Sequence, residues 1–596
     1  MTRPVRIANC SGFFGDRVSA ATQLLDGPDP IDVLTGDWLA ELTMSILARG
    51  RRRGRAGYAA TFLAQMEQVL GRCRERGVKV VSNAGGIDPR GCADKLREIA
   101  DRLGIAIGIA VVTGDDLTNR LEELRSAGER FAHLDTGKAW TGCADVIAAN
   151  AYLGGHAITA GLRAGADVVI AGRVADAAIV SGAAAWWHDW CADDFDALAG
   201  ATVAGHAIEC GTQVTGGNFA FFTDIVDIAN LTEPGFPIAE IAADGSSVIT
   251  KQPGTGGAVT VGTVTAQLLY EIAGPRYVVP DVVARFDTVQ VRQLQADRVQ
   301  ISGAKGEPAP AMAKVLLTYP GGFRNSMTLA ITGADRRAKA QLAERAVWAQ
   351  VRGGRGSFTE STVEIIGASL DSDGPDDQSY LRISVADRDA AVVGREFSSA
   401  VVATALGGFP GLYLTTPPGS AAEFMVGWPT LIHASHLHPR VCLDGREIAV
   451  PAPAHTQTVT ADEPRIAGCT KVFHRDDFTT VRVGHYVGAR SGDKGGNANL
   501  GLWVQNERDL PLLEYLTEPG RLATLLPELA HHEIRVYALP NLLAFNIVIV
   551  GLLGSGAAAS LREDPQAKSL GERFRAVRAR VPAALVPDTC IHEGTP

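Results

Sequence analysis

The first 225 residues alternate short apolar runs with helical patterns, and this alternation limits the folds open to the chain. The apolar runs lie at residues 5–8, 78–82, 106–112 and 168–171. Helical patterns lie between them, for example at residues 93–103. Apolar strands that alternate with helices are typical of a parallel sheet covered on both faces. We therefore predict an α/β domain over residues 1–225, with a mostly parallel, Rossmann-like sheet.

The sequence changes character after residue 225. Strand patterns and glycine turns dominate residues 226–451, which we expect to form a second α/β or α+β domain. Residues 452–477 are polar and lack periodicity, so we interpret them as a linker. Residues 478–596 contain two strand-rich segments and two helical patterns, which suggests a ferredoxin-like split βαβ domain.

Composition and charge exclude several classes of function. The 596 residues carry a formal net charge of −10 and are 46% hydrophobic, which is typical of a globular protein and not of a general nucleic-acid binder. Nine cysteines without a Cys-x-x-Cys pair are typical of reduced thiols in the cytoplasm. We see no signal peptide and no apolar stretch long enough to span a membrane. We expect a cytoplasmic homo-oligomer with no nucleic-acid or membrane partner.

Polar and glycine-rich segments follow the predicted strands of residues 1–225. In α/β sheets the carboxyl ends of parallel strands form the ligand crevice, so these segments make up the candidate binding site. No Gly-x-Gly-x-x-Gly motif follows the first strand and no Walker lysine motif occurs, so we expect no nucleotide cofactor. The candidate binding residues in these segments are Asn83, Gly85, Gly86, Asp115, Asp116, Tyr152, Arg173 and Asp176.

Two of these segments allow a structural as well as a functional interpretation. The backbone amides of Gly85 and Gly86, together with Asn83, can form a nest for an oxyanion, but the same residues favour a plain turn. The adjacent carboxylates of Asp115 and Asp116 repel each other, which can raise one pKa for acid–base chemistry. A helix cap beside a solvated acid would have the same sequence.

Three acidic residues and one histidine are the candidate catalytic groups. Asp37 and Glu41 are four residues apart and would share a helix face, although Asp37 could instead be an N-cap. Glu41 lies between leucines, and its burial would need a partner. His206 and Glu209 recur at helical spacing and could act as a general acid–base pair. His206 and Cys210 could also bind a metal, but no second ligand pair is visible, so we expect no metal.

A glycine-rich segment at residues 490–497 concentrates charge after a strand-like run. It contains Arg490, Ser491, Asp493 and Lys494. Glycine lets backbone amides face a ligand, and the cations attract an anion, so the segment is typical of a carboxylate or phosphate cradle. A solvated turn has a similar composition. The same two interpretations apply to Lys251, which also adjoins a glycine-rich loop, and to the arginines between residues 49 and 55.

Taken together, these segments resemble a known family, the acyclic terpene utilisation protein AtuA family. The resemblance covers roughly residues 4–450, and the segment from Arg490 to Gly495 resembles the small ferredoxin-fold domain that accompanies the family, over residues 478–590. The ordered motifs are Cys10–Asp16, Gly36–Glu41, Asn83–Gly86, Gly114–Asp116, Gly172-Arg173 with Asp176, and Gly205-His206 with Glu209-Cys210.

The resemblance implies a role in the breakdown of branched acyclic terpenoid or branched-chain acids as CoA thioesters, and it does not define a reaction. From the residues we predict a hydratase or lyase that acts on a branched acyl-CoA or organic acid without a redox cofactor. Glu209 or Glu41 would be the base, assisted by His206. Arg173 or Arg490, together with Lys494, would bind an anion. The alternative is a non-catalytic acyl-CoA-binding or scaffold protein for acyl-CoA carboxylase or dehydrogenase partners.

Overall fold

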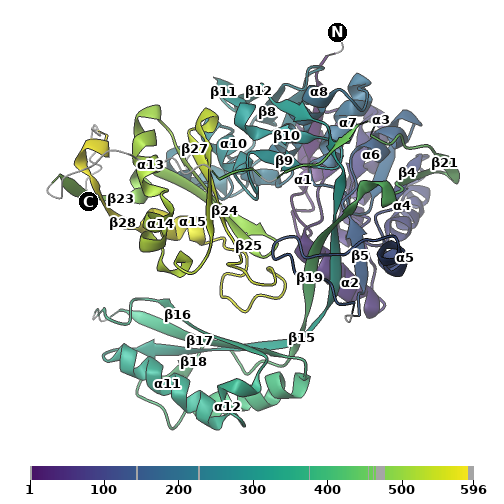
Figure 1. The fold of residues 1–596 in the computed structure, drawn as a ribbon. Coiled ribbons are helices and arrows are strands. Elements are labelled where there is room, and N and C mark those ends of the chain that lie inside the picture. The colour runs from purple at the N-terminus through teal and green to yellow at the C-terminus, as the bar shows by residue number, and fades with distance from the viewer. Residues whose placement is uncertain are drawn as a thin grey trace.

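An 11-stranded sheet forms the centre of the largest part of the molecule (Figure 1). The structure, a computed structural model, describes residues 3–142, 145–225, 228–372, 374, 376–453, 455–460, 462–464 and 477–587. Across the sheet the strands are β11 (Gln290–Gln295), β12 (Arg298–Ser302), β8 (Ser247–Lys251), β7 (Pro237–Ile241), β1 (Val5–Asn9), β2 (Val33–Gly36), β3 (Lys79–Ser82), β6 (Val168–Ala171), β4 (Ile109–Thr113), β20 (Arg440–Leu443) and β21 (Arg446–Ile448).

The expected mostly parallel sheet is not confirmed, because this sheet is mixed. Strands β1, β2, β3, β6 and β4 pair in parallel, as the alternating pattern predicts. Antiparallel strands extend both edges: β7 pairs with β1, and β20 pairs with β4. Strands β7, β8, β11 and β12 come from beyond residue 226, so the sheet continues across the position where we expected the second domain to begin. Local periodicity does not tell which sheet a strand will join.

Helices cover both faces of the parallel strands. Helices α1 (Ala20–Asp26), α3 (Ala60–Arg76) and α4 (Pro89–Leu103) pack on one face, and α6 (His156–Arg163), α7 (Ala178–His188) and α8 (Phe195–Ile208) pack on the other. Helix α4 shows the local signals clearly. The Asp88 carboxylate accepts from the Gly91 amide at its start, and Gly104 ends it in a left-handed conformation with φ of 68°.

A second sheet is built on the 21-residue strand β15 (Met312–Thr332). One end of β15 pairs with β5 (Ala148–Ala151), beside the first sheet. The other end carries the outer sheet, whose apolar face packs on α11 (Arg336–Gln350) and α12 (Phe397–Ala403), as Figure 1 shows. The remaining strands of this second sheet are β16 (Glu360–Gly367), β17 (Gln378–Asp387), β18 (Tyr413–Leu414) and β19 (Ala422–His433).

The C-terminal unit, residues 478–587, contains a four-stranded antiparallel sheet in the order β24 (Val487–Lys494), β25 (Asn497–Val504), β27 (Ala544–Ile549) and β26 (Ile534–Leu539). The charged segment at residues 490–497 is therefore not a loop after a strand. It is the end of β24 and the start of β25, joined at Gly495 and Gly496, and Gly495 has a positive φ of 61°. The helices of this unit are α13 (Leu510–Leu516), α14 (Pro519–Leu525) and α15 (Leu570–Ala576).

The remaining elements are short. They are helices α2 (Glu41–Arg52), α5 (Leu121–Ser126), α9 (Phe222–Ile225) and α10 (Val261–Leu268), and strands β9 (Arg276–Val278), β10 (Val283–Arg285), β13 (Lys305–Glu307), β14 (Ala309–Pro310), β22 (Thr456–Gln457), β23 (Phe478–Arg482) and β28 (Arg578–Pro582). Within the expected linker, residues 454, 461 and 465–476 lie outside the described residues. Within the described part of the chain, no helix has the length and apolar character needed to cross a membrane.

Two buried asparagines attach the C-terminal sheet to the rest of the molecule. The Asn499 side chain accepts from the Glu271 amide at 2.7 Å, and Asn499 and Asn546 both donate to the Ile272 carbonyl. Glu271 has a positive φ of 55°, an uncommon conformation for a residue with a Cβ, so this amide needs a fixed partner. The pair therefore holds the turn at Glu271 against the C-terminal unit.

We expect Asn499→Ala to destabilise the fold by about 1–3 kcal/mol, because it removes the partner of the Glu271 amide and of the Asn546 side-chain oxygen. Chemical denaturation of the variant and the parent chain measures the difference. The matched control is Gln290→Ala on the exposed edge strand β11, which should unfold like the parent. Equal stability of the Asn499 variant and this control would contradict the assignment.

Candidate functional site

Charged side chains from distant parts of the sequence meet where the C-terminal unit contacts the two larger sheets. We call this group the charged cluster. Its carboxylates and cations act on one another electrostatically, and several of them are buried. The members are Asp37, Glu41, Arg173, Asp176, His206, Glu209, Glu271, Lys314, Asp493 and Lys494.

Glu41 begins α2 and is held by two partners. Lys314 on β15 donates to its carboxylate at 2.7 Å, and the Tyr152 hydroxyl donates at 3.2 Å. The Arg173 guanidinium and the Lys314 ammonium lie 4.2 Å and 4.7 Å from the Tyr152 ring centroid, within cation–π range. Burial alone would raise the pKa of Glu41, but the Lys314 charge outweighs it and lowers the pKa to about 2. Glu41 therefore stays ionised.

Asp37 precedes α2 and is neither on the helix nor its N-cap, which is Ala40. The Asn83 side chain donates to the Asp37 carboxylate at 2.5 Å, and the Asn83 oxygen accepts from the Trp38 amide at 2.8 Å. Burial raises the pKa of Asp37 well above its usual range, and the charges of Asp176 and Glu209 add to this effect. Asn83 thus positions Asp37.

Arg173 is buried at the end of β6 with 3% of its surface exposed. It donates to Asp176 at 2.7 Å, and its Nε atom has no hydrogen-bond partner among the described residues. Its backbone amide donates to Asp115 at 2.9 Å, and the Asn150 side chain donates to the same carboxylate at 2.9 Å. Burial raises the pKa of Asp115 to about 6. Asp115 therefore fixes the backbone that carries Arg173.

His206 and Glu209 lie at the carboxyl end of α8, where the spacing predicts a pair. Nδ1 of His206 is 3.2 Å from Oε1 of Glu209. Burial and the Lys494 charge lower the pKa of His206 to about 4, and burial and the Asp176 charge raise the pKa of Glu209 well above its usual range. Near neutral pH the imidazole is unprotonated, and burial favours the protonated form of the Glu209 carboxyl group. Within the described residues, both ring nitrogens of His206 and Oε2 of Glu209 have no hydrogen-bond partner, so the 3.2 Å contact is close but not a hydrogen bond.

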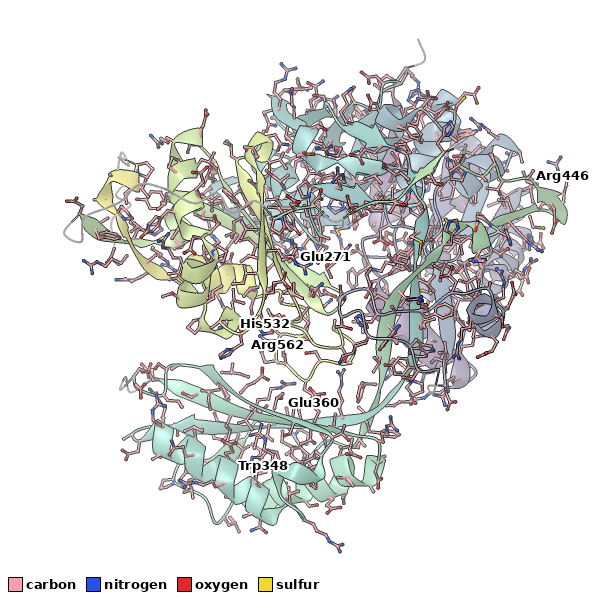
Figure 2. The ribbon with its side chains drawn as sticks, in the orientation of Figure 1. Glu271, Trp348, Glu360, Arg446, His532 and Arg562 are labelled. Atoms are coloured by element: carbon pink, nitrogen blue, oxygen red, sulfur yellow. The ribbon has the colours of Figure 1, made fainter. Side chains whose placement is uncertain are left out.

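The β24–β25 hairpin brings the C-terminal unit to this cluster. The charge of Lys494 acts on Glu41, His206 and Glu209. Asp493 accepts from the Gln566 side chain at 3.1 Å, and burial together with the Glu271 charge raises the pKa of Asp493 to about 7. Glu271 itself lies at the junction of the C-terminal unit with the largest sheet (Figure 2).

Arg490 completes the contact between the hairpin and the rest of the molecule. It donates to the Gln213 side chain, and its guanidinium lies 4.2 Å from the Tyr270 ring centroid. A desolvated cation over an aromatic ring is stabilised by about 2 kcal/mol. Arg490 therefore fastens the C-terminal unit at the edge of the charged cluster.

Five of the predicted residues have local partners that account for their positions. Lys251 pairs with Asp297 at 3.1 Å, and the Ser491 hydroxyl accepts from the Gly571 amide inside the C-terminal unit. Asp116 is exposed and accepts from the Thr118 amide. The Gly86 amide donates to the Asn83 carbonyl within a turn, and the position of Gly85 lies too close to the Ala171 carbonyl for a Cβ.

Sequence reasoning missed three residues of the site, Lys314, Glu271 and Lys568. Lys568 lies 3.4 Å from Glu271 and 3.8 Å from Asp493. One signal for Lys314 was present: it is the one charge in the apolar run at residues 312–318 at the start of β15, where a lysine needs a partner to be buried. Nothing in the sequence named Glu41 as that partner.

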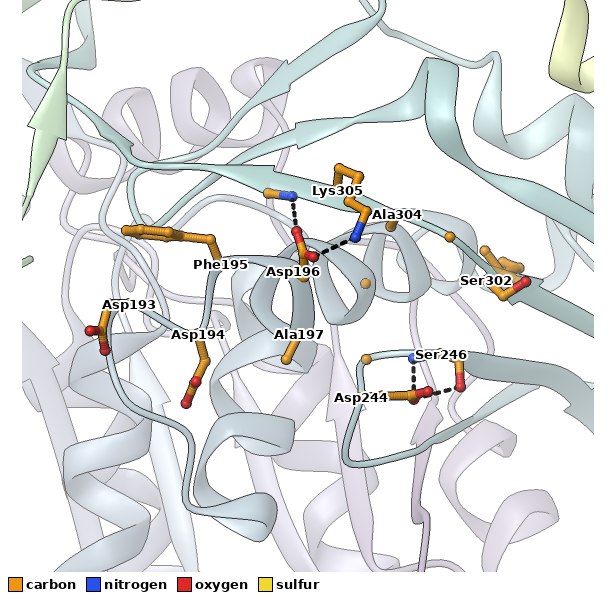
Figure 3. Close-up of a pocket in the computed structure, with 15 residues that line it drawn as sticks. Asp193, Asp194, Phe195, Asp196, Ala197, Asp244, Ser246, Ser302, Ala304 and Lys305 are labelled. Atoms are coloured by element: carbon orange, nitrogen blue, oxygen red, sulfur yellow. Dashed lines mark hydrogen bonds and ion pairs between the residues drawn. The ribbon is translucent and has the colours of Figure 1, made fainter.

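Of two hollows in the molecule, one borders the candidate residues and the other does not. A narrow cavity of about 20 Å³ lies against Glu41, Asp493 and Gly495 and is also lined by residues 555–558. A larger surface hollow of about 670 Å³ lies at the start of α8 (Figure 3), where Asp196 pairs with Lys305 and Asp244 accepts from Ser246. None of the candidate residues lines the larger hollow, so the narrow cavity is the one that belongs to the site.

The donor set does not suggest a metal. Over the part of the chain that the structure describes, no group of three or more His, Cys, Asp and Glu side chains is placed to hold a metal ion. His206 and Cys210 occur as a single pair.

Two family models match the chain, one over the larger N-terminal part and one over the C-terminal unit. The sequence model of the acyclic terpene utilisation family protein AtuA matches residues 5–443, and that of the AtuA ferredoxin-like domain matches residues 481–579. No curated protein and no solved structure matches the chain. All members of the charged cluster fall inside the two matched ranges.

The raised pKa of Asp493 predicts a pH-dependent stability. A carboxyl group whose pKa is higher in the folded than in the unfolded state favours folding at low pH, and this contribution is lost as the pH rises from about 4 to 7. Asp493→Asn removes the effect. We expect the variant to gain thermal stability relative to the parent across that window, as measured by the melting temperature at successive pH values. A constant difference, or one that matches the exposed control Asp189→Asn, would count against the shift.

The Glu41–Lys314 pair should behave as a coupled unit. Lys314→Met leaves the Glu41 carboxylate partly buried without its cation, and we expect a loss of about 1–3 kcal/mol in the free energy of unfolding. The double variant Glu41→Gln/Lys314→Met should lose less than the sum of the two single variants. Chemical denaturation of all four proteins completes the cycle, and simple additivity would show that the pair is not coupled.

Proposed function

The chain belongs to the acyclic terpene utilisation AtuA family, and we propose that within this pathway it is an acid–base enzyme, a hydratase or related lyase that acts on a branched or acyclic terpenoid acyl-CoA. The observation that carries the proposal is the buried His206–Glu209 pair beside Arg173 and Lys494. A protonated carboxyl group, an unprotonated imidazole and two cations are what water addition to a conjugated thioester requires. No electrons are exchanged in such a reaction, so it needs no redox cofactor.

In this proposal His206 acts as the base and Glu209 as the acid. In hydration, a water molecule attacks the β-carbon of the enoyl thioester and gives up its proton to the neutral imidazole of His206. Glu209 delivers its own proton to the α-carbon. The imidazolium then returns a proton across the 3.2 Å contact to Glu209, which restores the starting state. Dehydration runs the same transfers in reverse.

Arg173 and Lys494 have a separate task in this proposal. Attack at the β-carbon moves negative charge onto the thioester oxygen. The buried guanidinium of Arg173 keeps its Nε without a partner, and the Lys494 ammonium acts on the same carboxyl groups. Cations fixed in a water-poor site stabilise such an oxyanion strongly, because they need no reorganisation during the reaction.

Access to the pair requires movement. Glu209 and His206 are both buried, and the narrow cavity above Glu41 holds about 20 Å³. Residues 555–558 of the C-terminal unit line this cavity, and in this proposal displacement of the segment admits the substrate. A closed site would also keep bulk water from the enolate.

We expect Glu209→Gln to lower kcat/KM by about 100- to 10,000-fold on a panel of branched enoyl-CoA and 3-hydroxyacyl-CoA thioesters, because the acid is lost. Activity of the parent enzyme should fall at high pH as Glu209 loses its proton. Steady-state assays, with circular dichroism to verify folding, measure both.

The matched control is Glu572→Gln, an exposed glutamate on α15 that pairs with Arg575. It should retain full activity. A Glu209 variant as active as this control removes Glu209 from the mechanism. Thermal stabilisation by CoA thioesters without turnover in the parent chain would favour a binding protein instead of an enzyme.

A further inference from the structure

The outer sheet has one apolar and one polar face. Alternation along β17 points Leu381 and Ile383 toward α11 and α12, so Arg382 and Ser384 lie on the opposite face. The pairing register places Ser326 of β15 beside Ser384 on that face. Hydroxyl groups and guanidinium groups therefore collect on the face of the sheet that does not pack on the helices.

A cavity of about 340 Å³ lies between this polar face and residues 560–565 of the C-terminal unit, a size within the range of ligand sites. We call it the arginine pocket. Arg562 lies between the C-terminal unit and the sheet of β16 and β17 (Figure 2). The polar side chains that line it include Arg324, Arg382, Arg562, Ser326, Ser384 and Ser420.

The three guanidinium groups are not neutralised equally. Arg382 pairs with Glu364 at 2.7 Å, and Arg562 pairs with Glu528 at 2.9 Å. Arg324 donates only to the carbonyls of residues 558 and 560, at 3.1 Å and 3.2 Å, and within the described residues it has no carboxylate partner. Glu563 also lines the pocket, and Arg324 is the lining guanidinium group that has no carboxylate partner among the described residues.

Two other arginines repel the charge of Arg324. Burial lowers the pKa of Arg324, and the charges of Arg382 and Arg49 lower it further. Arg49 belongs to α2, the helix that begins at Glu41, and donates to the Glu423 carbonyl on β19. An anion in the pocket would relieve this repulsion, and arginine is the side chain best suited to phosphate oxygens.

Two polar atoms on this pocket have no partner in the described part of the chain. Ser384 is 1% exposed, and its Oγ makes no hydrogen bond. The Nε atom of Arg562 is also buried without an acceptor. Buried polar groups are normally hydrogen-bonded, so a donor pair left open on a cationic cavity indicates an absent acceptor.

We propose that the arginine pocket binds a phosphate group of the carrier portion of a CoA-type thioester. The segment at residues 555–563 connects it to the narrow cavity at Glu41, because residues 555–558 line that cavity and residues 560–563 line the arginine pocket. The identity of the ligand as an acyl carrier rests on the proposed function, whereas the preference for phosphate rests on the pocket alone.

Calorimetric titration of the full chain tests this with CoA, dephospho-CoA, adenosine 3′,5′-bisphosphate, adenosine and inorganic phosphate. We expect the bisphosphate and CoA to bind, adenosine not to bind, and Arg324→Gln to weaken CoA about tenfold or more. Ser384→Ala removes only a hydroxyl without a partner, so it should fold normally and weaken CoA severalfold. Arg337→Gln, on the exposed side of α11, is the matched control and should bind like the parent.

Three outcomes would overturn the proposal. They are equal CoA affinity in the parent, Arg324→Gln and Ser384→Ala chains, equal affinity for CoA and adenosine, and binding of inorganic phosphate that does not compete with CoA. Absence of turnover on the thioester panel would refute the proposed reaction and leave these binding results intact, so the two failures can be told apart.

Discussion

The burial of charge at the junction of three sheets is the constraint on which the rest of the structure depends. An ion removed from water costs several kcal/mol unless it is paired. Arg173 is compensated by Asp176 and Tyr152, and Glu41 by Lys314 from a different sheet. Each sheet therefore supplies charges that the others need. The relative positions of the three parts are set by this electrostatic balance as well as by apolar packing.

The same cations leave neighbouring carboxyl groups in opposite states. Arg173 and Lys494 act on both Glu41 and Glu209. Glu41 also has a direct hydrogen bond from Lys314 and remains ionised, whereas burial raises the pKa of Glu209 and favours its protonated form. Enzymes obtain an acid and a base from the same residue type by placing the two side chains in environments that separate their pKa values.

Local features of the fold and the site could be predicted from the sequence, and non-local ones could not. The parallel strands β1, β3, β4 and β6 follow from apolar runs, and the His206–Glu209 contact follows from helical spacing. The mixed edges of the sheet, and the pairing of Lys314 with Glu41 across 273 positions, depend on which segments meet in space. The charged hairpin at Lys494 was mistaken for a loop because its glycines hide the strand periodicity.

The long strand β15 borders both the narrow cavity and the arginine pocket. Leu316 lines the narrow cavity and Arg324 lines the arginine pocket, and both lie on this strand. Arg324 also donates to the Ala558 carbonyl at 3.1 Å, and Ala558 lines the narrow cavity. The walls of the two hollows therefore touch through one hydrogen bond. A ligand held in one hollow that moves this bond would change the shape of the other.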